Sequence, residues 1–138
     1  EITLVGLNQE QKEYLPEGIN GILRTNSAEE LAELYSSATV FINPTYADTY
    51  PTTNLEALAC GTPVITYKTG GSPEMLDERC GSVVMCDDVA ALEKEIIRLC
   101  TERSYSKEDC IKKAEAFDKN QRFKEYSELY ERIIASGT

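Results

Sequence analysis

The stretch NPTYADTYPTTNLEALACGTPVITYKTGGSPE, residues 43–74, contains more functional signal than the rest of the chain. It begins at the end of a β-branched and aromatic run, residues 39–44, which is typical of a strand. Helix formers follow in residues 52–60, and Gly61 stands where a left-handed C-terminal cap is expected. The predicted order is therefore strand, loop and short helix, with Asp48 in the loop.

This order places polar groups where α/β proteins bind ligands. Ligands gather outside the carboxyl ends of parallel strands, and the free amides of a helix N-terminus attract phosphate. Three residues would present such amides here: Thr52, Thr53 and Asn54. Glu56 lies one turn into the helix, where a carboxylate can accept hydrogen bonds from two ribose hydroxyls. Asp48, in the preceding loop, could reach the sugar end of the same ligand.

The same residues also have a purely structural interpretation. Residues 53–56, Thr-Asn-Leu-Glu, fit the capping box, which satisfies helix amides without any ligand. A second strand-like run, residues 63–67, leads into Lys-Thr-Gly-Gly-Ser-Pro-Glu at 68–74, where paired glycines permit close backbone approach. Two such turns after successive strands favour a shared ligand crevice.

Residues 48–74 resemble the donor-binding signature of the retaining family-four glycosyltransferases, enzymes of the GT-B fold with two Rossmann-like halves. The similarity extends over nearly the whole chain. The family signature has two acidic residues separated by seven others, a small-residue helix, a Gly-x-Pro-Val strand and a Gly-Gly turn before an acidic residue. Here Asp48 and Glu56 are separated by seven residues, Gly-Thr-Pro-Val occupies 61–64, and Gly-Gly-Ser-Pro-Glu occupies 70–74.

The resemblance implies a role for each matching residue. Glu56 matches the residue that binds the ribose hydroxyls, and Asp48 matches the carboxylate that contacts the donor sugar. The remaining matches are Thr49, Tyr50, Thr52, Thr53 and Asn54 for sugar and diphosphate, Gly70 and Gly71 for the crevice wall, and Leu23 and Arg24 for the base region.

Two departures from the family pattern affect these expectations. Asp48 stands where the family usually has Glu, which shortens the carboxylate's reach by one methylene. Tyr50-Pro51 stands where many members have Phe-Gly, so Pro51 lacks a backbone N–H that glycine would offer. The phosphate amides must then come from Thr52 onward.

Alternating strand-like and helical segments predict an α/β class chain. The strand-like runs are residues 2–6, 19–23, 39–44, 63–67 and 82–86. With the resemblance, they indicate a Rossmann-like three-layer domain with a parallel sheet, the C-terminal half of a GT-B fold. We expect residues 1–138 to be a single nucleotide-sugar-binding domain excised from a longer two-domain enzyme, because the chain begins in a strand without an initiator methionine.

Helix starts are predicted at Ser27, at Asp87-Asp88 and at Ser106, where capping residues precede apolar periodic segments. A final amphipathic stripe comprises Phe123, Tyr126, Leu129, Tyr130 and Ile133. Stripes of this kind are typical of the core, so we expect this one to be buried. The alternative is that the last helix packs on the missing half of the enzyme.

Charge and cysteine content exclude several function classes. The formal net charge is −10, with 24 acidic and 14 basic residues, which disfavours nucleic acid as a partner. Five cysteines without a Cys-x-x-Cys pair, and no histidine, disfavour a zinc site and a Ser-His nucleophile system. We expect no metal and no cofactor, no transmembrane segment, and a cytoplasmic location with peripheral contact at the inner membrane face through the missing domain.

The leading hypothesis is the donor half of a retaining bacterial glycosyltransferase, inactive as a fragment. It would bind a UDP-, GDP- or ADP-sugar and transfer a hexosyl group to a growing polysaccharide or glycolipid, with the acceptor held by the missing N-terminal domain. One alternative is a noncatalytic, doubly wound regulatory or partner-binding domain. A second is a glycoside hydrolase that uses Asp48 and Glu56 as its two carboxylates.

Overall fold

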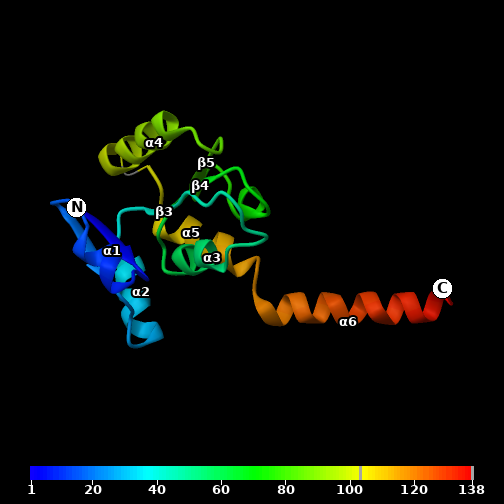
Figure 1. Cartoon of the computed structure of the whole chain (residues 1–138). Helices are drawn as coiled ribbons and strands as arrows, with labels where there is room; N and C mark the ends of the chain where they lie inside the picture. Colours follow the sequence, from blue (N-terminus) through cyan, green and yellow to red (C-terminus); the bar gives the residue numbers. More distant parts are fainter. Residues whose placement is uncertain (103, 138) are drawn as a thin grey trace. The chain divides into compact units, whose positions relative to one another are not determined.

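The computed structural model describes residues 1–102 and 104–137, which form two compact units, Glu1–Leu34 and Tyr35–Thr138 (Figure 1). The first unit contains β1 (Ile2–Val5), α1 (Gln9–Glu13) and β2 (Ile19–Ile22). The two strands are parallel, with Ile2 opposite Ile19. This unit is therefore one β-α-β step, as the alternation of the sequence predicts.

The next helix, α2 (Ala28–Ser37), begins with the predicted cap at Ser27. Ser27 Oγ accepts a hydrogen bond from Glu30 N at 3.2 Å. The Glu30 carboxylate accepts from Asn26 N at 2.6 Å, one residue before the position that a capping box would use. The helix start is as predicted, and both side chains contribute to it.

A three-stranded sheet lies at the centre of the second unit. Its strands are β3 (Phe41–Asn43), β4 (Val64–Tyr67) and β5 (Gly81–Val84), all parallel and in the order β3-β4-β5. The central strand β4 is buried along its whole length. This burial explains its uniformly bulky sequence, because a strand covered on both faces does not alternate apolar and polar residues.

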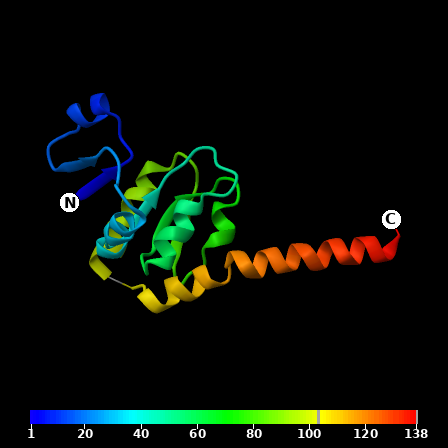
Figure 2. The same cartoon turned by 90° about the horizontal axis from the view of Figure 1, so that it is seen from below.

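Helices cover both faces of this sheet (Figures 1 and 2). One face carries α3 (Thr52–Ala59) and α5 (Lys107–Glu115), and the other carries α4 (Val89–Glu102). The short 3-10 helix η1 (Ser72–Met75) follows β4. The parallel, three-layer α/β prediction is therefore confirmed.

Local signals set the helix ends as expected. Asp88 Oδ1 accepts from Ala91 N at 2.9 Å at the start of α4, and Ser106 Oγ accepts from Asp109 N at 3.0 Å at the start of α5. Gly61 follows α3 with a φ of +78°, the left-handed conformation predicted for it. These contacts orient the loops that join the strands to the helices.

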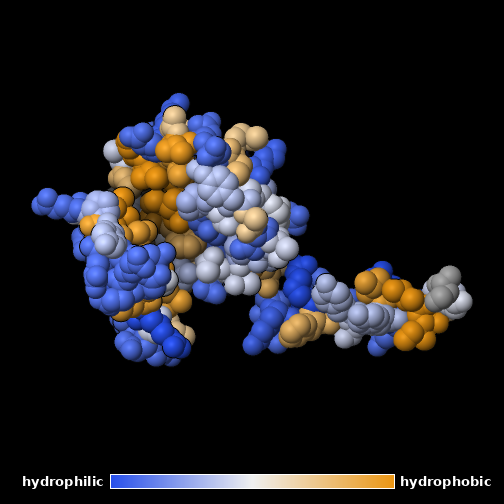
Figure 3. Space-filling view, viewed as in Figure 1, coloured by the Kyte–Doolittle hydropathy of each residue, from blue (hydrophilic) through white to orange (hydrophobic). Residues whose placement is uncertain are grey.

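The burial prediction for the last helix is wrong. The helix forms as α6 (Lys119–Ser136) but has no buried residue, and its predicted core stripe is 41% to 65% exposed. Apolar residues of α6 are visible as orange patches in Figure 3. Helical periodicity shows only that one face is apolar, and nothing in the described chain covers that face. Packing on a further domain remains a prediction.

Two further global features follow from the described residues. No helix among them is long and apolar enough to cross a membrane. Cys80 and Cys110 are buried thiols, and Cys86 and Cys100 are exposed thiols. Burial raises the pKa of the Cys110 thiol to about 12, so this side chain is an unreactive part of the core.

Candidate functional site

Three loops meet at the carboxyl edge of the β3-β4-β5 sheet. They are residues 44–51 after β3, 68–71 after β4, and 85–88 after β5. Because the strands are parallel, all three loops lie at the same edge. Most of the predicted site residues belong to these loops or to the first turns of α3.

The first turn of α3 is open. The residue that precedes it, Pro51, has an extended backbone with a ψ of 100° and provides no side-chain hydrogen bond. Asn54 N bonds to Pro51 O at 3.0 Å, whereas the amides of Thr52 and Thr53 have no acceptor within the described ranges. Helix N-termini attract anions through such free N–H groups and the helix dipole.

The structural interpretation of residues 53–56 as a capping box is wrong. A capping box needs Thr53 outside the helix and Glu56 at its third residue, but the helix begins at Thr52, so Glu56 is its fifth residue. The helix begins two residues earlier than it would after a Thr53 cap, and Pro51 stands directly before it with a φ of −70°. Glu56 is therefore not a capping residue of α3.

Glu56 points its carboxylate towards Tyr35. Its Oε2 atom accepts a hydrogen bond from the Tyr35 hydroxyl at 3.3 Å. Burial and the nearby Glu56 carboxylate raise the pKa of Tyr35 to about 12, so this hydroxyl stays a donor at neutral pH. Glu56 itself is exposed and lies four residues after Thr52, on the same side of the helix as the open amides.

Asp48 forms a turn within its own loop. Its Oδ1 atom accepts a hydrogen bond from Tyr50 N at 3.0 Å, and the side chain is exposed. This contact holds the carboxylate beside the backbone of the loop. The second carboxylate oxygen remains available to a ligand hydroxyl.

Gly70 and Gly71 allow the Asp48 loop to lie against the turn after β4. A Cβ atom at Gly70 would overlap the carbonyl oxygen of Asp48, and one at Gly71 would lie 2.5 Å from the ring of Tyr50. Gly71 N also donates to Thr49 O at 2.8 Å. The space that side chains would fill is thus occupied by the protein's own loop.

Buried polar side chains lie behind this edge. Asn43 Nδ2 donates to Asn54 Oδ1 at 2.8 Å, which ties the end of β3 to the first turn of α3. Thr66 Oγ1 donates to Asn43 O at 2.9 Å. Asn54 Nδ2 and Ser72 Oγ are fully buried and have no hydrogen-bond partner among the described residues. Unpartnered buried polar atoms are rare and are typical of sites that a ligand or water completes.

The structure brings nine predicted residues into the second unit. They are Asp48, Thr49, Tyr50, Thr52, Thr53, Asn54, Glu56, Gly70 and Gly71. Leu23 and Arg24 lie in the first unit, directly after β2, and both are exposed. The predicted base region thus belongs to a different unit from the predicted sugar and phosphate contacts.

Sequence reasoning missed two residues at the carboxyl edge. The Tyr46 hydroxyl donates to Asp87 Oδ1 at 2.8 Å and thereby connects the loops after β3 and β5. Asp87 has a φ of 67°, the left-handed region that non-glycine residues seldom adopt. An aspartate directly before a helix cap is the one sequence signal that points to this conformation.

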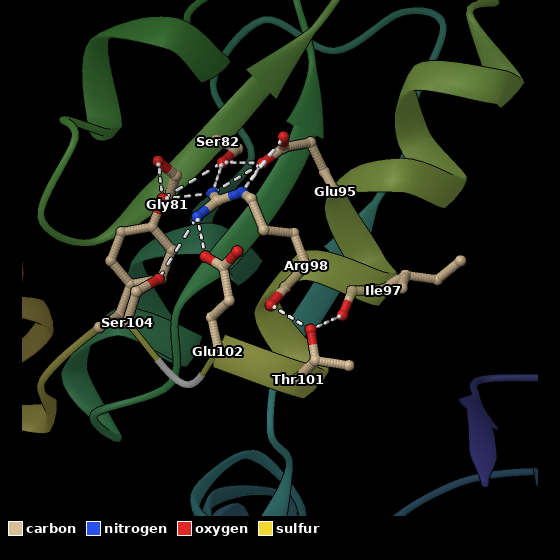
Figure 4. A network of polar contacts seen from close by, with 9 residues as sticks. Gly81, Ser82, Glu95, Ile97, Arg98, Thr101, Glu102 and Ser104 are labelled. Carbon is tan, nitrogen blue, oxygen red and sulfur yellow. Dashed lines mark hydrogen bonds and ion pairs between the residues drawn. The ribbon is translucent and has the colours of Figure 1, made fainter.

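The amino edge of the same sheet has a different character (Figure 4). Arg98 Nη2 donates to Glu95 Oε2 at 2.8 Å and to the hydroxyls of Tyr105 and Ser82 at 3.2 Å and 3.3 Å. These bonds hold the Arg98 guanidinium protonated and lower the pKa of the Glu95 carboxyl. The network connects α4 to the first residues of β5.

A cavity of about 290 Å³ also lies at the amino edge, and its wall includes Thr39, Pro63 and Tyr105. Lys107, the basic residue among the described lining residues, donates to Ser36 O at 3.4 Å and so helps to close the end of α2. The described contacts there are internal to the fold. The carboxyl edge is therefore the better candidate for a ligand site.

Comparison with known proteins identifies glycosyltransferases, the enzyme class that the sequence predicts. Residues 1–102 match the family of group 1 glycosyl transferases. Over 86 residues the chain is 34% identical to a D-inositol 3-phosphate glycosyltransferase of Streptomyces bingchenggensis, covering 59% of this chain and 19% of that one. Over 87 residues it is 36% identical to an MMP alpha-(1->4)-mannosyltransferase of Mycolicibacterium hassiacum, covering 59% and 21%.

A solved structure has the same fold. Sucrose-phosphate synthase from Thermosynechococcus elongatus matches with a TM-score of 0.76 and 27% identity, over 91% of this chain and 33% of that chain. The chain thus spans about a fifth of the length of these curated relatives and a third of the solved structure. These matches favour the transferase prediction over the regulatory-domain and glycoside-hydrolase alternatives.

Proposed function

The chain belongs to the group 1 glycosyl transferases, and we propose that it is the donor-binding half of a retaining hexosyltransferase. It would bind a nucleoside diphosphate sugar, with uridine, guanosine or adenosine as the base. The acceptor, a growing polysaccharide or glycolipid, would be held by an N-terminal domain of a longer two-domain enzyme. Residues 1–138 would then serve as one donor domain, inactive by itself.

The open first turn of α3 is the observation that carries this proposal. Thr52 and Thr53 offer two amides without an acceptor in the described part of the chain, and Glu56 follows one turn later without a capping role. A diphosphate at the amides would place its ribose near the Glu56 carboxylate, as acidic residues bind ribose in dinucleotide folds. Asn54 adds a buried Nδ2 donor in the same turn, which has no partner among the described residues.

The other residues complete the proposed donor site. Asp48 has one carboxylate oxygen in its loop turn and one for a hydroxyl of the donor sugar. Thr49 and Tyr50 are the sugar-side loop, and Gly70 and Gly71 shape it by admitting that loop against the turn after β4. Leu23 and Arg24 are proposed for the base.

The proposed chemistry needs little from side chains of this chain. The bond between the sugar carbon and the diphosphate breaks, and the α3 amides and helix dipole stabilise the negative charge on the departing diphosphate. The oxygen of the acceptor hydroxyl bonds to the sugar carbon, and the hydroxyl proton passes to the departing diphosphate. We propose that no metal or cofactor takes part, because neutral amides rather than a cation bind the leaving group. A net charge of −10 is compatible with this, since the amides act locally.

Calorimetric titration with UDP, GDP, ADP and their hexose conjugates tests the proposal. We expect a preference for one base, and a loss of at least about tenfold in affinity for Glu56→Ala, which corresponds to about 1.4 kcal/mol. Glu93→Ala is the matched control, because Glu93 is an exposed helical glutamate on α4. Equal affinities in wild type and Glu56→Ala would remove Glu56 from the site, and absence of binding to every nucleotide would contradict the proposal.

A further inference from the structure

The loop after β3 is tied to the loop after β5 by one polar contact. Tyr46 Oη donates to Asp87 Oδ1 at 2.8 Å, across 41 residues of sequence. Strand β4 lies between β3 and β5, and neighbouring strands are about 4.8 Å apart. The two strands whose loops are joined by this hydrogen bond are therefore roughly 10 Å apart. Tyr46 therefore crosses the end of the central strand.

The Tyr46 ring is held along this path. It meets the ring of Tyr67 edge-on, with the centroids 5.7 Å apart and the planes at 73°. Tyr67 is the last residue of β4 and is 3% exposed, so it forms a fixed support. Tyr46 is 65% exposed, and its position therefore depends on the Tyr67 ring and the Asp87 carboxylate rather than on burial.

Asp87 has a backbone conformation that needs an explanation. It is the one non-glycine residue with positive φ among those described, and this region costs energy for residues with a Cβ. The neighbouring Asp88 already caps α4 through its bond to Ala91 N. The Asp87 carboxylate is therefore not required by the helix. Strained residues persist where their surroundings enforce them, and they are frequent at functional sites.

Tyr46 and Asp48 belong to the same loop, residues 44–51 after β3. Thr69 Oγ1 donates to Thr45 O at 2.9 Å, and Gly71 N donates to Thr49 O at 2.8 Å, so both ends of the loop bond to the turn after β4. Between these two points, Tyr46 makes the bond to the loop after β5. The three contacts together fix the backbone on either side of Asp48.

We propose that Tyr46 and Asp87 are positioning residues that hold the Asp48 loop for the sugar moiety of the donor. This inference rests on the proposed function. The contact acts on Asp48, at the sugar end, and not on the α3 amides or Glu56, which receive the diphosphate and ribose. Loss of the contact should therefore weaken binding of a nucleotide sugar more than binding of the free nucleoside diphosphate.

Two single variants separate positioning from folding. Tyr46→Phe removes the hydroxyl but keeps the ring on Tyr67. Asp87→Gly removes the carboxylate, and glycine adopts positive φ without strain, so the fold is retained. A hydrogen bond to a charged group is worth enough for a change of about tenfold, which we expect for the hexose conjugate. For the free nucleoside diphosphate we expect a change below about twofold.

Tyr130→Phe is the control, because Tyr130 on α6 is 63% exposed, close to the value for Tyr46. It should leave both affinities unchanged. The double variant Tyr46→Phe/Asp87→Gly should lose no more than either single variant, since both remove the same bond. Urea unfolding of each variant confirms that a folded protein is titrated.

The outcomes are distinguishable. Equal changes for the hexose conjugate and the free diphosphate, or no change in either variant, would overturn the positioning role while wild-type binding upholds the donor site. Failure of the wild-type protein to bind any of the nucleotides would overturn the proposed function, and the positioning role with it. A selective loss for the hexose conjugate in both variants would support both.

Discussion

The two edges of the β3-β4-β5 sheet use polar groups in opposite ways. At the amino edge, the Arg98 guanidinium bonds to Glu95, Ser82 and Tyr105, and the network is complete within the protein (Figure 4). At the carboxyl edge, the amides of Thr52 and Thr53 and the buried Asn54 Nδ2 and Ser72 Oγ atoms have no partner within residues 1–102 and 104–137. Polar groups that bond to one another stabilise a fold, whereas groups left open are available to a ligand. Substitutions at the two edges should therefore affect different measurements.

The largest effect is expected for Gly70→Ala at the carboxyl edge. The Cβ of the alanine would overlap the Asp48 carbonyl, and the residue would have to keep a φ of +48°. We therefore expect a loss of about 2–4 kcal/mol in unfolding free energy and loss of nucleotide-sugar binding. Urea unfolding and titration measure the two. Gly18→Ala is the control, because Gly18 has a φ of +86° with open space around it and should lose only about 1 kcal/mol. Equal losses in the two variants would show that the close approach of the Asp48 loop is unimportant.

Arg98→Ala at the amino edge should reduce stability without reducing nucleotide affinity. It leaves Glu95, Ser82 and Tyr105 partly buried with fewer partners, so we expect the unfolding free energy to fall by about 1–3 kcal/mol. Nucleotide affinity should stay within about twofold of wild type, because the network does not reach the carboxyl edge. Arg98→Lys keeps the charge but not the forked geometry and should recover only part of the loss. A large drop in affinity for folded Arg98→Ala would break the separation of the two edges.

Tyr35→Phe should have a smaller effect, confined to the carboxyl edge. The variant loses the bond to Glu56 but keeps the edge-on contact between ring 35 and Phe41, whose centroids lie 5.2 Å apart. Without this donor the Glu56 carboxylate is less well oriented, so nucleotide affinity should fall by about two- to fivefold, or about 0.5–1 kcal/mol. In Glu56→Ala the same change at Tyr35 should have no further effect on affinity. Additive losses would mean that Tyr35 acts independently of Glu56.

The smallest effect concerns pH at the amino edge. The hydrogen bond from Arg98 lowers the pKa of Glu95 below its ordinary value of 4.5. The resulting stabilisation is present above pH 4.5 and is lost as the pH falls through the lowered pKa. The difference in unfolding free energy between wild type and Arg98→Ala should therefore shrink between pH 7 and pH 3, as measured by urea unfolding.

Arg79→Ala provides the comparison for this pH dependence. The pKa of Asp77 is lowered mainly by the backbone N–H of Arg79, which the substitution retains. The free-energy difference between wild type and Arg79→Ala should therefore change little with pH. A constant difference for Arg98→Ala as well would show that the Arg98–Glu95 pair contributes no pH-dependent stability.

Local sequence determined most of the elements around the candidate site. The strand before residue 44, the helix after Pro51, the left-handed Gly61 and the caps at Asp88 and Ser106 were predictable because each depends on residues a few positions apart. The spacing of Asp48, Glu56 and the Gly-Gly turn indicated the glycosyltransferase family, and the match of residues 1–102 to the group 1 glycosyl transferases agrees with it.

Spacing alone left one question open, which tertiary structure decided. The segment from Thr53 to Glu56 fits both a cap and a ligand site, and the choice depends on where the helix begins. The helix begins at Thr52, directly after the buried Pro51. Glu56 therefore does not cap the helix and instead accepts a hydrogen bond from Tyr35, a residue 21 positions away. Such a contact has no signature in local sequence.

The α/β class with parallel strands, the family and the acidic charge could all be predicted from the order of the residues, because composition, periodicity and motif spacing are local properties. Three features became known from the fold: the glycine turn packs against the Asp48 loop, Tyr46 bonds to Asp87, and the apolar stripe of α6 is exposed. These features depend on which segments meet across tens of residues, and an amphipathic pattern does not specify what covers its apolar face.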